Sequence, residues 1–280
     1  MDLVLPASRN HPVSGAANAR ICLTYLWRHG KLPDLHNPQS FTEWVQWRKL
    51  HDRDARLPIF ADKVVAKEIV AERIGAEWVT PTLWHGTELP AQPEWPAPFV
   101  VKSRHGCNQY AFVFGTCANW SAVRRKAKRW MKRDYGFWLD EWLYNHIPHG
   151  ILIEPFIGEA KALPIDYKFY VFGGRVKYVQ VHLGRGGRHR WIVFDRAWQR
   201  VSAITADADP SPPKTLARMI EAAEELARGF DFVRVDLYEV SGKPLFGEMT
   251  FYPGSGLDPF SPVSLDQMIG GHWSQVKRLS

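Results

Sequence analysis

Two neighbouring predicted strands near the C-terminus carry two carboxylates, a hydroxyl group and a guanidinium group. An alternation of apolar and polar residues places Arg234 and Asp236 on one face of the first strand. The turn at Ser241–Gly242 leads into a second strand, which carries Glu248 and Thr250 on one face. If the strands pair as a hairpin, these oxygen atoms lie together, and such a set suits Mg²⁺. A surface hairpin with solvated charges is the alternative.

A tight turn is predicted directly after the second strand. Pro253 followed by Gly254 ends the strand and favours a turn. Glycine allows backbone N–H groups to approach a ligand closely, so Gly254 and Ser255 are candidates for binding developing negative charge or the carboxylate of an incoming substrate. An ordinary turn at the end of a hairpin is the alternative.

A lysine ends the apolar segment Phe99–Lys102, which predicts a short buried strand. A buried lysine is unfavourable unless it is paired, and a lysine beside a flexible loop can bind phosphate. The loop that follows contains His105 and Gly106, and another strand comes after it. The alternative is a lysine that extends into solvent before an ordinary hairpin.

Two further charges interrupt predicted strands. Glu154 lies in the apolar segment 151–157, where its carboxylate could accept a hydrogen bond from an adenine amino group. Lys168 lies inside the alternating segment 166–182, which predicts further strands. Each of the two could instead be a structural charge that is paired inside the protein.

The rest of the chain indicates a mixed α/β protein without repeats. The clearest helix is 62–75, where Asp62 can cap the start, Gly75 can end the helix, and apolar residues form one stripe. The other predicted helices are at 16–27, 42–50, 119–146 and 214–229. A polar, proline-rich loop is predicted at 205–213.

Composition limits the classes of function. The formal net charge of +7 and the pI of about 9.3 indicate an acidic partner such as a nucleotide, an acidic sugar, a membrane surface or nucleic acid. Cys22, Cys107 and Cys117 form no CxxC motif, which predicts reduced thiols in a cytoplasmic protein, without a disulfide or zinc. Residues 1–10 lack the features of a signal peptide, and no apolar run is long enough to span a membrane.

Together, these motifs resemble the ATP-grasp fold, and most closely its TupA-like branch, which is linked to teichuronopeptide and polysaccharide biosynthesis. The segments that carry the resemblance are Ala61–Lys63, Phe99–Lys102, Asp166–Phe169, Phe232–Asp236 and Gly247–Gly256. The resemblance implies an α/β (α+β) fold in which two α+β lobes hold ATP between antiparallel sheets. The implied divisions are a short helical N-terminal region at 1–60, a small lobe with a lid loop and a basic helix at 61–155, and a large lobe with the metal site at 156–280.

The same resemblance implies ATP and two Mg²⁺ ions as cofactors, and it assigns roles to individual residues. The implied ATP-binding residues are Lys102 and Lys168 for the phosphates, Glu154 and the backbone near Phe156 for adenine, Glu159 for ribose, and His105 and Gly106 in the lid loop. The implied metal ligands are Asp236, Glu248 and Thr250. The implied catalytic residues are Arg234, Lys168, Gly254 and Ser255. The chain departs from the family pattern at Thr250, where many members have Asn, and in a lid loop with few glycines.

The reaction implied by the resemblance is carboxylate–amine ligation. ATP would phosphorylate a carboxylate to an acyl phosphate, and an amine of amino-acid type would then attack to give an amide, in polysaccharide or secondary-metabolite biosynthesis. A kinase that phosphorylates a hydroxyl group would share the nucleotide half of this site. Sequence alone does not separate the two outcomes or fix the oligomeric state.

A basic segment is the main rival signal, because seven of the ten residues at 124–133 are positively charged. A solvated helix face is one interpretation. A second is a landing site for an anionic saccharide or for an acceptor at a membrane surface. A third is a non-enzymatic module that binds nucleic acid, which is disfavoured because such modules need interleaved aromatic residues and Trp130 stands alone.

Overall fold

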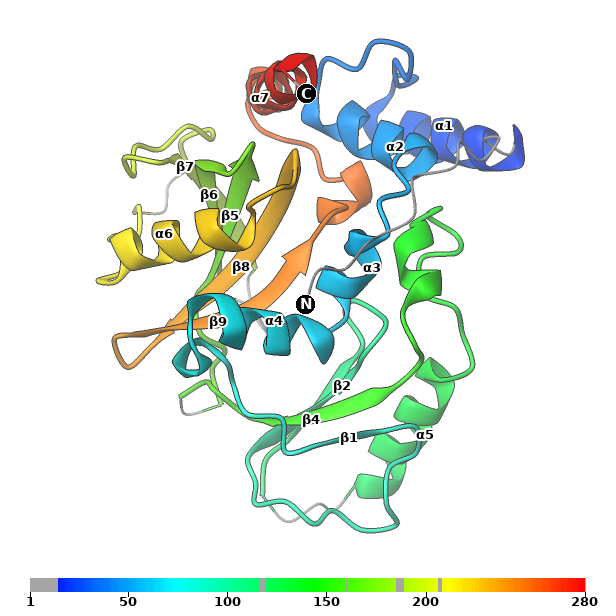
Figure 1. Cartoon of the computed structure of the whole chain (residues 1–280), viewed down its shortest axis with the longest axis vertical. Coiled ribbons are helices and arrows are strands. Elements are labelled where there is room, and N and C mark those ends of the chain that lie inside the picture. The colour runs from blue at the N-terminus through cyan, green and yellow to red at the C-terminus, as the bar shows by residue number, and fades with distance from the viewer. Residues whose placement is uncertain (1–14, 116–118, 160, 185–188, 206–207, 280) are drawn as a thin grey trace.

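The computed structural model of the chain describes residues 15–115, 119–159, 161–184, 189–205 and 208–279, and this part forms two antiparallel sheets (Figure 1). The smaller sheet has the order β1-β4-β2-β3, with β1 at Trp84–Gly86, β2 at Phe99–Ser103, β3 at Tyr110–Val113 and β4 at Ile151–Pro155. The larger sheet has the order β7-β6-β5-β8-β9, with β5 at Asp166–Phe172, β6 at Arg175–Leu183, β7 at Arg190–Asp195, β8 at Phe232–Val240 and β9 at Lys243–Thr250. The predicted α+β architecture is confirmed.

The described helices are α1 (Gly15–His29), α2 (Phe41–His51), α3 (Arg56–Ala61), α4 (Val65–Ile74), α5 (Trp120–Trp130), α6 (Leu216–Leu226) and α7 (Val263–Leu279). Short 3₁₀ helices lie at Ala76–Trp78 (η1), Trp142–His146 (η2) and Pro253–Gly256 (η3). The helices predicted at 16–27, 42–50, 62–75 and 214–229 are therefore present with shifted ends. Asp62 accepts a hydrogen bond from the Val64 backbone N–H (2.9 Å), so the helix itself begins at Val65.

The single helix predicted at 119–146 is wrong. Helix α5 ends at Trp130, and turns connect it to η2. Gly136 and Asp140 both have positive φ angles, of +80° and +55°, which an α-helix does not tolerate. The carbonyl oxygen of Gly136 instead accepts hydrogen bonds from the N–H groups of Leu139 (3.1 Å) and Glu141 (3.0 Å). This turn becomes important below, because it brings Glu141 to the candidate site.

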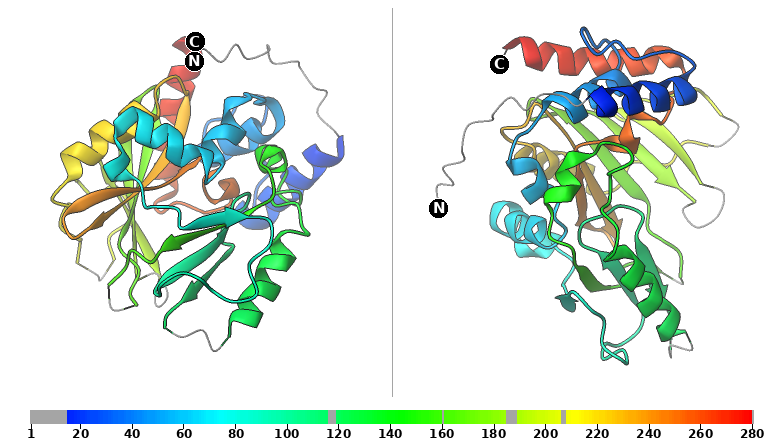
Figure 2. Two further views of the ribbon diagram at one scale, coloured as in Figure 1. Left: turned by 60° about the horizontal axis from the view of Figure 1, so that its bottom comes forward. Right: turned by 90° about the vertical axis from the view of Figure 1, so that its right-hand side faces the viewer.

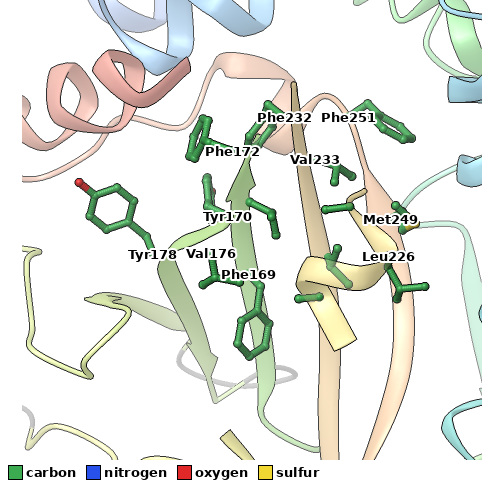
Figure 3. Close-up of a cluster of buried hydrophobic side chains, with 14 of the residues drawn as sticks. Phe169, Tyr170, Phe172, Val176, Tyr178, Leu226, Phe232, Val233, Met249 and Phe251 are labelled. Atoms are coloured by element: carbon green, nitrogen blue, oxygen red, sulfur yellow. The ribbon is translucent and has the colours of Figure 1, made fainter. Parts of the chain in front are cut away.

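The N-terminal helices belong to the core of the larger sheet. Ser40 and Glu43 form a capping box at the start of α2, which fixes where this helix begins. The ring of Phe41 then packs within 5.4 Å of Tyr170, 5.1 Å of Phe232 and 5.7 Å of Trp273, measured between ring centroids. Figure 3 shows the aromatic side chains of β5 and the start of β8 in this core. The division of the chain at residues 60 and 155 remains a proposal.

A buried guanidinium group fastens α2 to the sheet. Arg48 is fully buried, donates to the carbonyl oxygen of Phe232 (2.8 Å) and forms an ion pair with Asp231. Its guanidinium also stacks over the Trp273 ring of α7, 4.3 Å from the centroid. Burial alone would raise the pKa of Asp231, but Arg48 and Lys277 outweigh it and hold that pKa below its usual range.

The two faces of the smaller sheet have different neighbours. Phe99 and Val101 of β2 pack with Trp120 and Trp130 of α5, so this helix covers one face (Figures 1 and 2). Side chains alternate along a strand, so Lys102 points to the opposite face, where a cavity lies. The basic helix is thus on the far side of the smaller sheet from that cavity.

The described residues include seven α-helices and two of the three cysteines. None of the described helices combines the length and apolar character needed to cross a membrane. Cys22 and Cys107 are free thiols, while Cys117 and residues 1–10 lie outside the described residues. Burial raises the pKa of Cys107 to about 11, so this thiol is protonated at neutral pH.

Two adjacent glycines in α7 test the packing of α2 against α7. A Cβ atom on Gly270 would lie 2.3 Å from the Gln39 carbonyl oxygen and 2.6 Å from the Phe41 backbone nitrogen, whereas a Cβ on Gly271 would meet nothing within 4 Å. We expect Gly270→Ala to lower the free energy of unfolding by about 2 kcal/mol or more. Gly271→Ala is the control and should raise it by up to about 1 kcal/mol. Urea unfolding followed by circular dichroism measures both, and equal stability of the two variants would contradict this packing.

Candidate active site between the two sheets

A cavity of about 550 Å³ lies between the sheets. Lys102 and Glu154 of the smaller sheet line it, together with Lys168, Arg234 and Glu248 of the larger sheet. An apolar pocket of about 90 Å³ adjoins it and shares part of its lining. Charged and apolar regions thus form one continuous site between the sheets.

A row of charged residues crosses the larger sheet at the cavity. Lys168 of β5 lies opposite Asp236 of β8, and Asp236 lies opposite Glu248 of β9. Directly paired residues on neighbouring strands share a face, so the register brings the three side chains together. Arg234 and Thr250 form the next pair along β8 and β9. The hairpin inferred from the sequence therefore exists, and it gathers the predicted residues.

Asp236 is the most completely surrounded of these residues. It is 1 % exposed and accepts two hydrogen bonds from Arg234, each of 2.7 Å. Lys168 forms a further ion pair with Asp236 and contacts Asp166 at 2.8 Å. Burial alone would raise the pKa of Asp236, but Arg234 and Lys168 outweigh it and lower that pKa, so the group is ionised.

Glu248 and Thr250 complete a set of oxygen ligands. Glu248 lines the cavity, 3.7 Å from a nitrogen of Arg234. The Thr250 hydroxyl accepts a hydrogen bond from Arg234 (3.2 Å) and donates to Glu248 (3.4 Å). Two carboxylates and a hydroxyl on one face are hard oxygen donors, the type of ligand that Mg²⁺ prefers. The residues present therefore fit a Mg²⁺ ion.

A β-bulge shapes this part of β9. The pairing shifts after Asp236, so that Leu237 lies opposite Phe246 and Gly247 is the additional residue. A Cβ atom on Gly247 would lie 2.9 Å from the carbonyl oxygen of Asp236, which leaves room only for glycine at this position. Bulges commonly redirect side chains beside active sites, and this one lies directly before Glu248 in β9.

The smaller sheet contributes a second charged cluster. The Glu154 carboxylate, 5 % exposed, forms ion pairs with Lys102 (2.6 Å) and with Lys67 of α4. Burial alone would raise the pKa of Glu154, but the two lysines outweigh it and lower that pKa. Lys67 also donates to the carbonyl oxygen of Thr80 (2.8 Å). The predicted residues Lys102 and Glu154 therefore contact each other, and both carboxylate oxygens of Glu154 are already occupied.

The adjoining pocket has the apolar character that a flat aromatic base requires. Its lining includes Val100, Phe112, Phe156 and Phe246. The ring of Phe156 packs 5.5 Å from Phe112 in an edge-to-face arrangement, measured between centroids. The Phe156 backbone N–H donates to the Pro98 carbonyl oxygen (3.0 Å), so the ring, rather than this N–H group, faces the pocket.

Three other predicted ATP-binding residues have different surroundings. Gly106 lines the cavity, and its carbonyl oxygen accepts a hydrogen bond from Lys63. Glu159 is exposed and lines neither cavity, and its described side-chain partner is Ser241 (3.4 Å). The interpretation of His105 as a lid-loop ligand is corrected, because this residue is fully buried and lines neither cavity.

His105 is buried because it packs against neighbouring residues beside the smaller sheet rather than facing the cavity. Its ring stacks on that of His149, with centroids 4.0 Å apart. Its Nδ1 accepts a hydrogen bond from the Gly150 N–H (3.3 Å), so Nε2 donates to the Trp130 carbonyl oxygen (3.3 Å). Burial and the neighbouring His149 lower its pKa to about 4, so the imidazole is neutral and structural.

The predicted turn after β9 is the 3₁₀ turn η3, with Gly254 and Ser255 both in the left-handed region at φ angles of +53° and +57°. Gly254 and Ser255 line the cavity. The Ser255 carbonyl oxygen accepts hydrogen bonds from Gln46 (2.8 Å) and Lys49 (2.8 Å) of α2. Helix α2 therefore holds the inner side of this turn, while its outer side faces the cavity.

A buried ammonium group fixes the hydroxyl of the turn. Lys49 is 2 % exposed and donates to the Ser255 hydroxyl oxygen (2.7 Å), so the hydroxyl's own proton is directed to Glu141. Glu141, brought in by the turn that interrupts the predicted helix, also lines the cavity. Burial raises the pKa of Glu141, and Lys49 and the Ser255 hydroxyl only partly offset this effect. Lys49, Ser255 and Glu141 thus form one polar group at the end of the cavity.

Sequence reasoning missed Lys67, Lys49 and Glu141 as parts of the site. Lys67 and Lys49 lie on the buried sides of α4 and α2, next to Ala66 and Leu50. A lysine inside the apolar side of an amphipathic helix is the signal that could have identified both. For Glu141 the chain gives no comparable signal, because its position depends on turns with unusual φ angles.

Comparison with known proteins adds family information. The family model described as TupA-like ATPgrasp matches residues 43–274. No curated protein matches the chain. Among solved structures, D-alanine–D-alanine ligase from Bacillus anthracis complexed with ATP has 14% identity and a TM-score of 0.48, covering 79% of this chain and 64% of that one. L-amino acid ligase from Bacillus licheniformis has 16% identity and a TM-score of 0.44, covering 71% and 42%. The chain spans less than two thirds of the length of these structures.

The buried Lys49 generates a prediction about stability and pH. Burial lowers the pKa of Lys49 to about 8, below the value of about 10.4 in an unfolded chain, so the unfolded state binds more protons between these values. As the pH rises from about 8 to about 10.4, the free energy of unfolding of the wild type should therefore increase by about 3 kcal/mol more than that of Lys49→Met. The variant lacks the buried amine and has no such pH dependence. Lys214→Met, at an exposed lysine, is the control and should follow the wild type. Denaturant unfolding at pH 7 to 10.5 measures the difference, and parallel curves for wild type and Lys49→Met would refute it.

Proposed function

Because the chain belongs to the TupA-like ATP-grasp family, we propose that it is an ATP-dependent ligase that activates a carboxylate and joins it to an amine. Family membership confirms the ATP-grasp fold expected from the sequence motifs. The observation that carries the proposal is that Lys168 and Glu248, the register partners of the buried Asp236, line the same cavity as Lys67, Glu154 and Lys102. Such a site offers metal ligands and phosphate ligands together.

ATP would lie along the cavity from its apolar end to its charged end. The base would occupy the pocket beside Phe112 and Phe156, and the phosphates would extend towards Lys102, Lys67 and Lys168. The oxygens of Asp236, Glu248 and Thr250 would hold Mg²⁺. A bound Mg²⁺ ion supplies charge neutralisation and polarises the phosphoryl group that is transferred.

The reaction then needs positioning more than covalent catalysis. A carboxylate oxygen of the substrate attacks the γ-phosphorus, the bond to the β-phosphate oxygen breaks, and an acyl phosphate and ADP form. The amine nitrogen next attacks the acyl carbon, phosphate leaves, and the amine loses a proton to give the amide. Arg234 and Lys168 stabilise the negative charge on the transferred group, and the turn at Gly254–Ser255 receives a carboxylate or developing negative charge at the acceptor end.

The role we propose is in polysaccharide or secondary-metabolite biosynthesis, with an amino-acid-like amine as acceptor, as the resemblance of the sequence motifs implies. The direct test is ADP release, screened with pairs of amino acids and carboxylate substrates that include uronic acids. An amide with ADP and free phosphate is the expected result. A phosphoester with ADP and no free phosphate would identify a kinase and overturn the ligase proposal.

Removing the metal ligands should abolish turnover in protein that is still folded, although Asp236→Asn also leaves Arg234 and Lys168 uncompensated and should lower the free energy of unfolding. We expect Asp236→Asn and Glu248→Gln each to lower kcat at least a hundredfold, because they weaken the charge that holds Mg²⁺. Thr250→Val should lower activity, whereas Thr250→Asn, which keeps an oxygen ligand, should be tolerated. Glu221→Gln, at an exposed acid of α6, is the control. Normal Mg²⁺-dependent activity in both carboxylate variants would rule out this metal site.

Removing the phosphate ligands should weaken ATP binding. Lys102→Ala and Lys168→Ala should each weaken ATP binding by about 1.5–3 kcal/mol, the value of a charge-assisted hydrogen bond. Calorimetry with ATP and Mg²⁺ measures the change, and Lys214→Ala provides a control for the loss of one surface charge. Unchanged ATP affinity in both variants would mean that the phosphates bind elsewhere.

A further inference from the structure

Helix α5 carries charge of one sign only. Its exposed cations and those of the turn after it are Arg125, Lys126, Lys128, Arg129, Lys132 and Arg133. No acidic residue occurs between positions 119 and 133. Helices α4 and α6, by contrast, carry both acidic and basic residues, as solvated helix faces usually do. The charge of α5 is therefore not the ordinary surface pattern of this protein.

The spacing of these cations makes the pattern unfavourable for the helix alone. Arg124, Lys128 and Lys132 follow one another at intervals of four residues, which places them on one side at about 6 Å per step. Like charges at this spacing destabilise a helix by about 0.2–0.5 kcal/mol per pair. Among the described residues, only Glu88 forms an ion pair with a cation of α5, at 4.0 Å from Arg124. Within the described residues, the row Arg124, Lys128 and Lys132 therefore has a single counter-charge, Glu88.

A groove of about 520 Å³ lies along the same side of α5. Four cations line it, Arg124, Arg125, Lys128 and Lys132, together with one acid, Glu88, which is paired with Arg124. The apolar residues Leu89, Met131 and Ile151 contribute to its lining, and the aliphatic stems of the lysines and arginines add apolar surface. The groove thus offers both positive charge and apolar surface to one ligand.

This groove is separate from the candidate active site. Its lining residues do not line the cavity or the pocket between the sheets. Ile151 and Phe99 lie with α5 on one face of the smaller sheet, whereas Lys102 and Glu154 face the cavity on the other. Figure 2 shows α5 on the outside of the smaller sheet. A ligand held here would have to be an extended molecule to reach the cavity.

We propose that the α5 groove binds a carboxylated polysaccharide chain. Sugar rings present apolar faces that fit the apolar lining, and regularly spaced carboxylates fit the row of cations. Nucleic acid would need exposed aromatic platforms along the row of cations, but the two aromatic residues of α5 itself, Trp120 and Trp130, are buried at 4 % and 7 % exposure. A bilayer would need exposed large apolar side chains, and none of the described residues of α5 provides one. The proposal does not depend on which reaction the cavity catalyses.

Binding of polygalacturonate to the full chain tests the proposal. We expect measurable binding in calorimetry or fluorescence anisotropy that weakens as salt is raised, because exposed charges are screened within about 10 Å at 0.1 M ionic strength. The triple variant Arg125→Glu, Lys128→Glu and Lys132→Glu should bind at least tenfold more weakly. Its affinity for ATP should equal that of the wild type, which separates this test from any failure of the active-site proposal.

The matched control reverses three exposed cations elsewhere, Lys214→Glu, Lys243→Glu and Arg278→Glu, and changes the net charge by the same amount. This control should bind polygalacturonate within threefold of the wild type. Equal losses in both triple variants would show that only net charge matters and would overturn the proposal. Equal or tighter binding of poly-L-glutamate, of an oligo-deoxythymidine or of vesicles containing phosphatidylglycerol would also overturn it, because each lacks the carboxylated sugar rings. Neutral dextran should not bind.

Discussion

The carboxylate of Asp236 is the point on which the candidate active site depends. It is buried on β8, between β5 and β9, and is held by Arg234 from its own strand and by Lys168 from the neighbouring strand. Removing one partner of such a buried pair is strongly destabilising, because an uncompensated charge remains in the interior. The strands β5, β8 and β9 must therefore keep one register, and this register also fixes where Glu248 and Thr250 lie.

The N-terminal helices complete the site as well as the core. Helix α2 fastens to the sheet through Arg48 and its aromatic neighbours, and the same helix presents Gln46 and Lys49 to the turn after β9. From α1, His29 adds a hydrogen bond to the Gly256 carbonyl oxygen (3.1 Å). The end of the cavity at η3 is consequently built jointly by the hairpin and by helices far away in sequence. Burying Lys49 is unfavourable for stability, and its position at the turn is consistent with retention for function.

Local patterns in the sequence are sufficient to identify the charged hairpin, the strand that ends in Lys102, and most helices. Period-two alternation fixes which residues of a strand share a face, so the amino-acid sequence alone places Arg234 and Asp236 side by side. Lys67 and Lys49 interrupt the apolar sides of their helices, which indicates buried lysines, but their partners Glu154 and Ser255 are brought to them only by tertiary packing. His105 was misinterpreted because a loop histidine gives no sign of stacking on His149, and the helix at 119–146 was overextended because the positive φ angle of Asp140 leaves no clear sequence signal.

The most direct test of the account is a crystal structure with a non-hydrolysable ATP analogue and Mn²⁺, which accepts the same oxygen ligands as Mg²⁺. The account predicts an anomalous-scattering peak between the carboxylates of Asp236 and Glu248. It also predicts the adenine ring beside Phe112 and Phe156, with the phosphates directed towards Lys102. A nucleotide bound outside the cavity between the sheets, or a metal ion that contacts neither carboxylate, would contradict the account.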